Sequence, residues 1–195
     1  MTVTSFAHWC DLGPYLASHD LLGDMADVGA CTGPWTMNML RWGAVRVYAI
    51  DTWRHVDGAR GCRGLPQEEH DKNYQMFLKT IREYRGRVVI LQGDSVRVSR
   101  FIPDASLSFA YIDACHEKSF VARDLEAYWP KMVEGGILAG HDFLNPIYGV
   151  WAAVHEFAGR HKLEIGTIPE NNPDEASFWF LKPQKDSPCQ PSPLP

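Results

Sequence analysis

The fold can be deduced from residues 27–34, which read DVGACTGP, and from residues 45–51, which read VRVYAID. An apolar segment leads into an acid and two glycines. A helix is expected to begin at the proline, because the first helical position does not need the missing N–H. Gly29 and Gly33 let the backbone approach a ligand closely. A second strand then ends in Asp51, where an acid can accept the hydroxyls of a ribose. The two segments predict a strand–helix–strand unit that binds a nucleoside-containing cofactor.

The spacing of the glycines distinguishes between two kinds of cofactor. Dinucleotide folds commonly carry G-x-G-x-x-G, so that a pyrophosphate can lie against the helix N-terminus. Here the spacing is D-x-G-x-x-x-G, and Asp27 stands where a phosphate would need backbone donors. A carboxylate suits a cationic amino acid moiety instead. The arrangement resembles motif I of the class I S-adenosylmethionine-dependent methyltransferases, in which Asp51 matches the ribose-binding acid. From the residues alone, a unit whose glycines serve only turn geometry remains the alternative.

Length and composition favour a single domain. The chain has 195 residues, of which 45% are hydrophobic, enough for one substantial core. We expect this domain to span residues 1–183, and the proline-rich residues 184–195 to form a disordered tail. A net charge of −5 disfavours a nucleic-acid partner.

The sequence also bears on the compartment. No apolar run approaches the roughly 20 residues of a membrane span, and residues 1–10 do not resemble a signal peptide. The five cysteines are odd in number and form no Cys-x-x-Cys pair. They are therefore expected to be free thiols in a reducing compartment. These features predict a cytoplasmic protein without a membrane partner.

Strands and helices are expected to alternate along the chain. Helices are predicted at residues 4–20, 34–42, 67–84, 118–129 and 148–160, and strands at 24–29, 45–51, 87–91, 107–112, 136–139, 163–168 and 176–181. Short apolar strands separated by amphipathic helices indicate a mostly parallel sheet covered on both faces. The predicted fold class is α/β, with a single-domain, Rossmann-like, doubly wound sheet of seven strands.

A doubly wound sheet binds its ligand at the carboxyl ends of its strands. The first five predicted strands end near acids, and two of them also end near a histidine. These residues are Asp27, Asp51, Asp94, Asp113, His116, His141 and Asp142. So many like charges at one edge destabilise a protein unless a ligand or a cation uses them. The sequence therefore predicts a functional site at this edge.

Three segments carry a more specific resemblance. They are residues 111–117, which read YIDACHE, residues 121–130, which read VARDLEAYWP, and residues 135–142, which read GGILAGHD. Together they resemble the methyltransferase 24 family of bacterial small-molecule methyltransferases, over roughly residues 24–160. The resemblance implies S-adenosylmethionine as the cofactor, with Asp94 near the adenine amino group and Ser95 beside it. The chain departs from the family at Ala114-Cys115, where a glycine is common.

The resemblance also implies a mechanism. Asp113, His141 and Asp142 take the positions of the metal ligands of metal-dependent O-methyltransferases, which would hold Mg²⁺ or another divalent cation, although His141 stands where those enzymes usually have a carboxylate. His116 takes the position that those enzymes give to the catalytic base, and histidine can exchange a proton near neutral pH. As an alternative, His141 and Asp142 only form hydrogen bonds with the substrate or with strand ends.

Two further features, Trp53 and the loop that contains it, bear on the site. Trp53 is expected either to stack on adenine or to pack in the core. The spacing of His55 and His70 matches no zinc site. The loop at residues 52–66 is instead expected to be a mobile lid, because its glycines give the backbone freedom.

Three functions are compatible with the sequence. The first is methyl transfer to a hydroxyl of a small-molecule acceptor. The second is a nicotinamide-dependent oxidoreductase on a similar sheet, and the third is a binding protein that keeps the cofactor without catalysis. The sequence leaves open whether the chain forms a homodimer.

Overall fold

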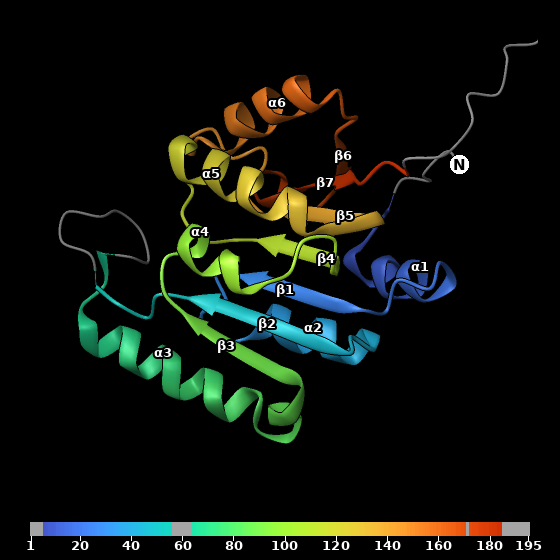
Figure 1. Ribbon diagram of the computed structural model, residues 1–195. Helices are drawn as coiled ribbons and strands as arrows, with labels where there is room; N and C mark the ends of the chain where they lie inside the picture. The colour runs from blue at the N-terminus through green and yellow to red at the C-terminus, as the bar shows by residue number, and fades with distance from the viewer. Residues whose placement is uncertain (1–5, 56–63, 171, 185–195) are drawn as a thin grey trace, which may run out of the picture.

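The computed structural model describes residues 6–55, 64–170 and 172–184. These residues form one seven-stranded sheet with helices on both faces (Figure 1). The strands are β1 (Asp24–Val28), β2 (Arg46–Asp51), β3 (Val88–Gln92), β4 (Leu107–Ile112), β5 (Met132–Gly140), β6 (Gly166–Ile168) and β7 (Ser177–Leu181). The α-helices are α1 (Leu12–Ser18), α2 (Pro34–Trp42), α3 (Gln67–Thr80), α4 (Ser95–Val98), α5 (Lys118–Tyr128) and α6 (Val150–His161).

The strand order is β3-β2-β1-β4-β5-β7-β6, and β1 to β5 run parallel to one another. Strand β7 pairs antiparallel with both β5 and β6. The order reverses between β1 and β4, so the carboxyl ends of these two central strands open the crevice where a doubly wound sheet binds its ligand. The predicted Rossmann-like, mostly parallel sheet is therefore confirmed.

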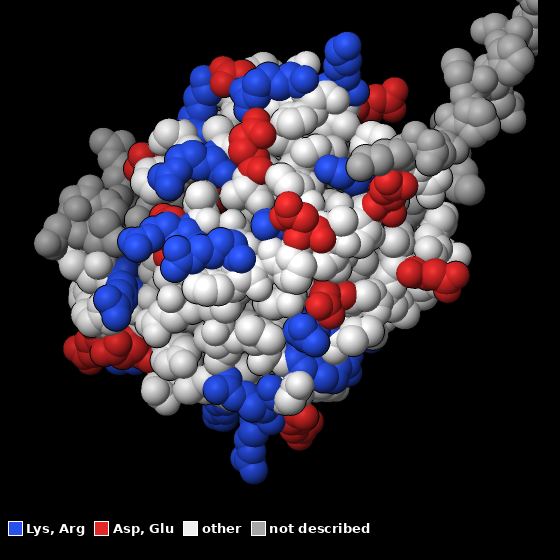
Figure 2. Space-filling model, viewed as in Figure 1, with Lys and Arg blue, Asp and Glu red and all other residues white. Residues whose placement is uncertain are grey.

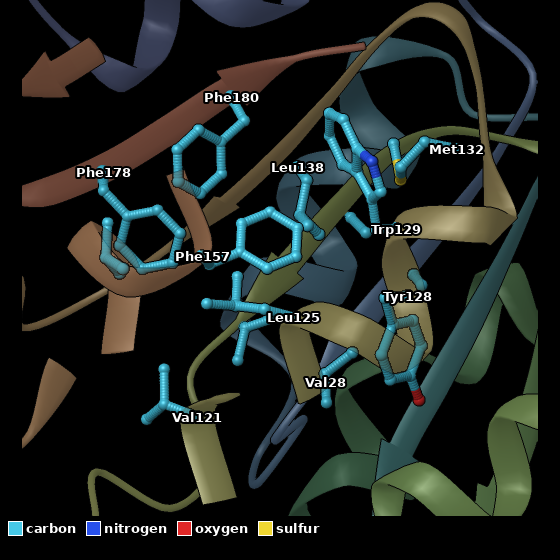
Figure 3. Close-up of a cluster of buried hydrophobic side chains, with 14 of the residues drawn as sticks. Val28, Val121, Leu125, Tyr128, Trp129, Met132, Leu138, Phe157, Phe178 and Phe180 are labelled. Atoms are coloured by element: carbon cyan, nitrogen blue, oxygen red, sulfur yellow. The ribbon is translucent and has the colours of Figure 1, made fainter. Parts of the chain in front are cut away.

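Two layers of helices cover the sheet because side chains alternate along each strand. Helices α4, α5 and α6 share a core cluster with Val28 of β1 and Leu138 of β5. In this cluster Leu125 of α5 and Phe157 of α6 lie against Leu138 (Figure 3). Helices α1, α2 and α3 cover the other face. Each fully buried large apolar side chain contributes roughly 1.5–3 kcal/mol relative to exposure, so this double packing fixes the strand ends.

Most predicted elements are present, with four corrections. The N-terminal helix expected at residues 4–20 is, in its described part, a 3-10 turn at Trp9–Asp11 followed by the short α1. Helix α3 ends at Thr80, and a 3-10 segment continues to Arg87. Strand β5 begins four residues earlier than expected, at Met132. The short helix α4 was not predicted, since its four residues are too few for a periodic pattern.

Two expectations concern residues that the structure leaves out. Residues 185–195 of the predicted tail and residues 56–63 of the predicted lid lie outside the described residues. Within the described ranges, no helix combines the length and apolar character needed to cross a membrane.

Candidate active site

A cavity of about 250 Å³ opens at the carboxyl ends of β1, β2, β3 and β4. Seven of the residues singled out in the sequence line it: Gly29, Asp51, Trp53, Asp94, Ser95, Asp113 and His116. The other lining residues come from the same strand ends and from α3 and α5, and include Cys31, Thr52, His70, Asn73, Cys115, Phe120 and Asp124. Asp27 and Gly33 are not among the described lining residues.

The two glycines of the turn have packing roles that the sequence did not reveal. Gly29 has φ +101°, and a Cβ there would lie 2.0 Å from the carbonyl oxygen of Asp113. Gly33 has φ +92°, and a Cβ there would lie 3.0 Å from the ring of Phe77. Both positions need glycine for the left-handed backbone and for space inside the protein. Gly29 lines the cavity and lies against the residue that follows β4, whereas the expectation that Gly33 lets a ligand approach stays a prediction.

Asp51 ends β2 with both carboxylate oxygens held by backbone donors. The N–H of Cys31 donates to Oδ2 and the N–H of Trp53 donates to Oδ1, each over 2.9 Å. Each oxygen has a further lone pair, so the carboxylate can accept two more hydrogen bonds. The two backbone donors fix the carboxylate at the cavity wall, where the sequence predicts that it binds ribose hydroxyls.

The side of the cavity where the sequence predicts adenine is formed by the start of α4 and by α5. Asp94 caps α4 by accepting a hydrogen bond from the N–H of Arg97 over 3.0 Å. The hydroxyl of Ser95 donates to Asp124, and the hydroxyl of Tyr128 donates to the carbonyl of Ser95 over 3.1 Å. Asp94 and Ser95 are therefore held in place by α4 and α5, and both line the cavity.

Trp53 is engaged within the protein. Its side chain is buried, its Nε1 donates to the carbonyl of Cys31 over 2.8 Å, and its ring lies 4.9 Å from that of Tyr74 and 5.1 Å from that of Phe77. Of the two expectations for this residue, packing in the core accounts for these contacts. Only part of the side chain is left to line the cavity.

Asp27 lies below the cavity, 1% exposed, and accepts a hydrogen bond from the hydroxyl of Thr36 over 2.6 Å. It is one residue short of the end of β1, and its side chain faces α2. Burial raises the pKa of Asp27 to about 7, although the hydrogen bonds from Thr36 lower it, and the charges of Asp113 and Asp51 raise it further. Asp27 is thus held against α2, and its predicted role in cofactor binding stays a prediction.

The raised pKa of Asp27 predicts a dependence of stability on pH. The unfolded carboxyl titrates near 3.8 and the folded one near 7, so between these values the folded chain binds more protons. Stability is therefore expected to fall as the pH rises from about 4 to 7, by at most about 4 kcal/mol at 1.36 kcal/mol per pKa unit.

Asp27→Asn should remove that slope, because an amide can still accept the bond from Thr36 but does not ionise. The free energy of unfolding of the parent and of Asp27→Asn is measured with urea between pH 4.5 and 8. The difference between the two free energies cancels the contribution of the other carboxyl groups. Asp104→Asn, at a far more exposed acid, is the matched control. If the difference in unfolding free energy between the parent and Asp27→Asn does not change with pH, the prediction is wrong.

Three predicted metal ligands meet beside the cavity. Asp113, His141 and Asp142 each offer one ligand atom, and these atoms lie within 4.8 Å of one another. Asp113 follows β4, and the other two follow the neighbouring β5. The imidazole Nδ1 of His141 lies 3.4 Å from Oδ1 of Asp142, and this contact is the largest cause that raises the pKa of His141. Burial raises the pKa of Asp142, but the bond with His141 and the charge of His116 outweigh it and leave the pKa below its ordinary value.

His116 stands between the two carboxylates of this group. Its Nε2 lies 3.2 Å from Oδ1 of Asp113 and 3.2 Å from Oδ2 of Asp142. Its ring also lies 4.5 Å from the ring of Tyr148. The side chain is 25% exposed, so a ligand can reach it from the cavity. One imidazole is thus placed to exchange a proton at the edge of the cavity, with two acids to orient it.

Sequence reasoning missed several lining residues of the helices. His70 and Asn73 lie one turn apart on α3, and His70 is buried, with no partner for its Nε2 among the described residues. Phe120 and Asp124 come from α5. Their i, i+3 and i, i+4 spacings mark a common helix face, but the sequence does not say which face points at the cavity.

Comparison with known families and structures places the chain among methyltransferases. The profile of a family described as a methyltransferase domain matches residues 26–143. No curated protein sequence matches the chain.

Solved structures share the fold at low identity. The O-methyltransferase NovP has a TM-score of 0.65 at 18% identity, covering 89% of this chain and 77% of its own. The calicheamicin methyltransferase CalS11 has a TM-score of 0.62 at 18% identity, covering 90% and 80%. An rRNA methylase from Streptococcus thermophilus has a TM-score of 0.59 at 14% identity, covering 88% and 97%. This likeness shows that the fold is shared. The methyl acceptor has to be inferred from the residues of the site.

Proposed function

The chain belongs to the methyltransferase 24 family and is an S-adenosylmethionine-dependent methyltransferase; from this premise we propose that it methylates a hydroxyl of a small metabolite. The observation that carries the proposal is His116 at the edge of the cavity, 3.2 Å from carboxylate oxygens of both Asp113 and Asp142. A hydroxyl acceptor loses its proton during methylation, and a positioned imidazole can take it.

Each part of the site has a role in this reaction. Asp51 holds the ribose hydroxyls, and Asp94 with Ser95 holds the adenine. The cofactor supplies a methyl group on an already activated sulfonium. The S–CH₃ bond breaks as the O–CH₃ bond forms, the electron pair stays on sulfur, and the hydroxyl proton moves to His116. Because the sulfonium is already activated, alignment by these residues supplies most of the catalysis.

His116 must exchange one of its carboxylate contacts for the acceptor hydroxyl. Both contacts are made by Nε2, so the nitrogen that faces the carboxylates is also the one that takes the proton, unlike a Ser-His-Asp triad, whose acid contacts the opposite ring nitrogen. The imidazolium formed by proton transfer still faces a carboxylate, which stabilises its charge.

Asp113, His141 and Asp142 fit a divalent cation such as Mg²⁺ or Mn²⁺, because two carboxylates and one imidazole converge within 4.8 Å. Bound there, a cation would hold two adjacent hydroxyls of an acceptor and lower the pKa of the reacting one. Without a cation, His141 and Asp142 would orient the acceptor by hydrogen bonds alone.

A small-molecule acceptor fits the charge distribution on one face of the described surface. On the face that α4, α5 and α6 form, positive and negative side chains are interspersed (Figure 2). Several of the cations there are paired, for example Lys118 with Glu156 and Arg160 with Glu126. Such a surface lacks the continuous basic field that binds nucleic acid. The cytoplasmic location expected from the sequence stays a prediction.

Methyl transfer is tested by incubating the purified chain with methyl-labelled S-adenosylmethionine and a panel of small hydroxyl compounds. A product heavier by one methyl group at oxygen supports the proposal. Label transferred only to nitrogen or carbon acceptors would overturn it. The nicotinamide alternative is set aside by membership of the methyltransferase family. A chain that binds the cofactor and transfers nothing to any acceptor would support the binding-protein alternative.

Replacing Asp51 tests the cofactor site. Asp51→Ala should weaken S-adenosylmethionine binding by roughly 1.5–3 kcal/mol, the range for hydrogen bonds to a charged group. Calorimetric titration measures this loss. Asp20→Ala, at an exposed acid outside the site, serves as the control. Unchanged affinity in a folded Asp51→Ala protein would show that the ribose is held elsewhere.

A further inference from the structure

A group of large apolar side chains stays exposed beside the candidate active site. Among the described residues, eight large hydrophobic side chains are exposed, and four of them fall in one eight-residue segment. These four are Leu144 (46%), Ile147 (87%), Tyr148 (40%) and Trp151 (52%), and we call them the apolar platform. The other four, which are Val45, Leu65, Met76 and Phe101, are dispersed along the chain.

The apolar platform is attached to the residues proposed to react. It begins two residues after Asp142, whose carbonyl accepts a hydrogen bond from the N–H of Asn145 over 3.3 Å. Tyr148 places its ring 4.5 Å from that of His116. The N–H of Gly149 donates to the carbonyl of His116 over 2.9 Å. The segment is thus tied at one side to the proposed metal group and at the other to the proposed base.

The ring of Trp151, the more exposed of the two aromatic rings in the apolar platform, packs against other rings of the protein. The ring of Trp151 lies 3.9 Å from that of His155, and His155 stacks on the buried Phe143 at 5.6 Å. The imidazole Nδ1 of His155 also contacts the carbonyl of Trp151 over 2.9 Å. A supported aromatic side chain loses little conformational entropy when a ligand covers it, which favours binding.

Resting on the proposed function, we propose that the apolar platform binds a flat, apolar ring system of the acceptor and so directs its hydroxyl toward His116. Four exposed large apolar side chains within one eight-residue segment are a feature of the kind that marks a ligand or partner site. The hydroxyl of Tyr148 and the indole N–H of Trp151 are the only side-chain polar groups of the four residues, so the platform offers little to a bare sugar. A stable dimer uses 20–30 residues a side, far more than these four, so a second copy of the chain fits less well.

The test compares two acceptors that carry the same pair of hydroxyls. The probes are 1,2-dihydroxybenzene and 2,3-dihydroxynaphthalene, which differ by one fused ring. Their dissociation constants are measured by calorimetry in the presence of S-adenosylhomocysteine and Mg²⁺, so that binding is read independently of turnover. The parent chain should bind the naphthalene diol about 10-fold more tightly, because one additional aromatic contact contributes roughly 0.5–1.5 kcal/mol beyond its buried area.

The decisive variant is Ile147→Ser combined with Trp151→Ser. Both side chains are exposed, so the fold should survive, and neither contacts His116 in the described structure. The naphthalene diol should lose its 10-fold advantage, while the affinity for 1,2-dihydroxybenzene stays unchanged. The matched control is Val45→Ser combined with Met76→Ser, which removes two exposed apolar side chains elsewhere and should keep the advantage.

Several outcomes would overturn the inference. The first is a roughly 10-fold tighter binding of the naphthalene diol that persists in the platform variant. The second is an equal loss of affinity for both diols in that variant, and the third is a parent chain that binds neither diol. Sedimentation of the parent and the variant provides a fourth: a dimer that the platform substitutions dissociate would make the surface an interface between copies. If the diols bind as expected but neither is methylated, the binding inference holds and the proposed hydroxyl methylation fails for these acceptors.

Discussion

Replacement of His116 by alanine is expected to lower kcat by about 10²–10⁴-fold, the usual contribution of a positioned general base. The imidazole is the described group that both lines the cavity and contacts the two acids Asp113 and Asp142. Without it, the acceptor proton must pass to water or directly to a carboxylate, in a less favourable geometry. Affinity for S-adenosylmethionine should change little, because Asp51 and Asp94 remain in place.

The measurement is single-turnover methyl transfer, expressed per folded molecule. Added imidazole should restore part of the rate, because a small base can occupy the space that the substitution leaves. His19→Ala provides a matched control, since His19 is exposed and far from the strand ends. Normal kcat with reduced stability would assign His116 a structural role through its contacts with Tyr148 and Gly149, and would exclude it as the base.

The arrangement of the site could largely be predicted from the sequence. Parallel strands bring their carboxyl ends to one edge, so acids that follow different strands must converge there. Asp51 ends a strand, Asp94 and Asp113 each follow one, and all three line one cavity. The resemblance over residues 111–142 also indicated that Asp113, His141 and Asp142 belong together, and the structure brings them within 4.8 Å.

The direction of individual side chains could not be predicted in the same way. Asp27 and Asp51 both belong to the cofactor motif, yet Asp51 lines the cavity and Asp27 is buried against α2. Asp51 is the last residue of its strand, whereas Asp27 is followed by Val28 within β1, so the next layer of packing covers it. A motif gives residue types and spacing, and the burial of each acid depends on how far it stands from the strand end.

The apolar platform shows a second limit. An apolar pattern such as Ile147, Tyr148 and Trp151 at the start of a helix ordinarily indicates a buried face. Here Val150 and Val154 face the core instead, and the alternate side of the segment stays exposed. The spacing of Val150, Val154, Phe157 and Ala158 predicts the buried face of α6, and the structure confirms it. Local periodicity does not explain why the platform residues stay exposed instead of forming a second buried face.

Removal of divalent cations is expected to abolish methyl transfer while the fold survives. Two carboxylates and an imidazole from two neighbouring strand ends form the proposed site, and both strands are held by the large core cluster without any cation. The site is therefore expected to be functional rather than structural, unlike small zinc domains, which unfold when the metal is removed. Activity in excess chelator, compared with the circular dichroism spectrum under the same conditions, measures both parts of the prediction.

Asp142→Asn then distinguishes a ligand from an orienting group. An amide oxygen binds a hard divalent cation more weakly than a carboxylate, so the Mg²⁺ concentration for half-maximal activity should rise. Partners that only support metal ligands typically contribute 10–100-fold to affinity, so the loss of a ligand charge should raise that concentration at least about 10-fold. Saturating Mg²⁺ should recover part of the rate, which the loss of a simple hydrogen bond would not allow. Asp174→Asn, at an exposed acid outside the group, is the matched control. Full activity of the parent in excess chelator would eliminate the cation and leave His141 and Asp142 to orient the acceptor through hydrogen bonds.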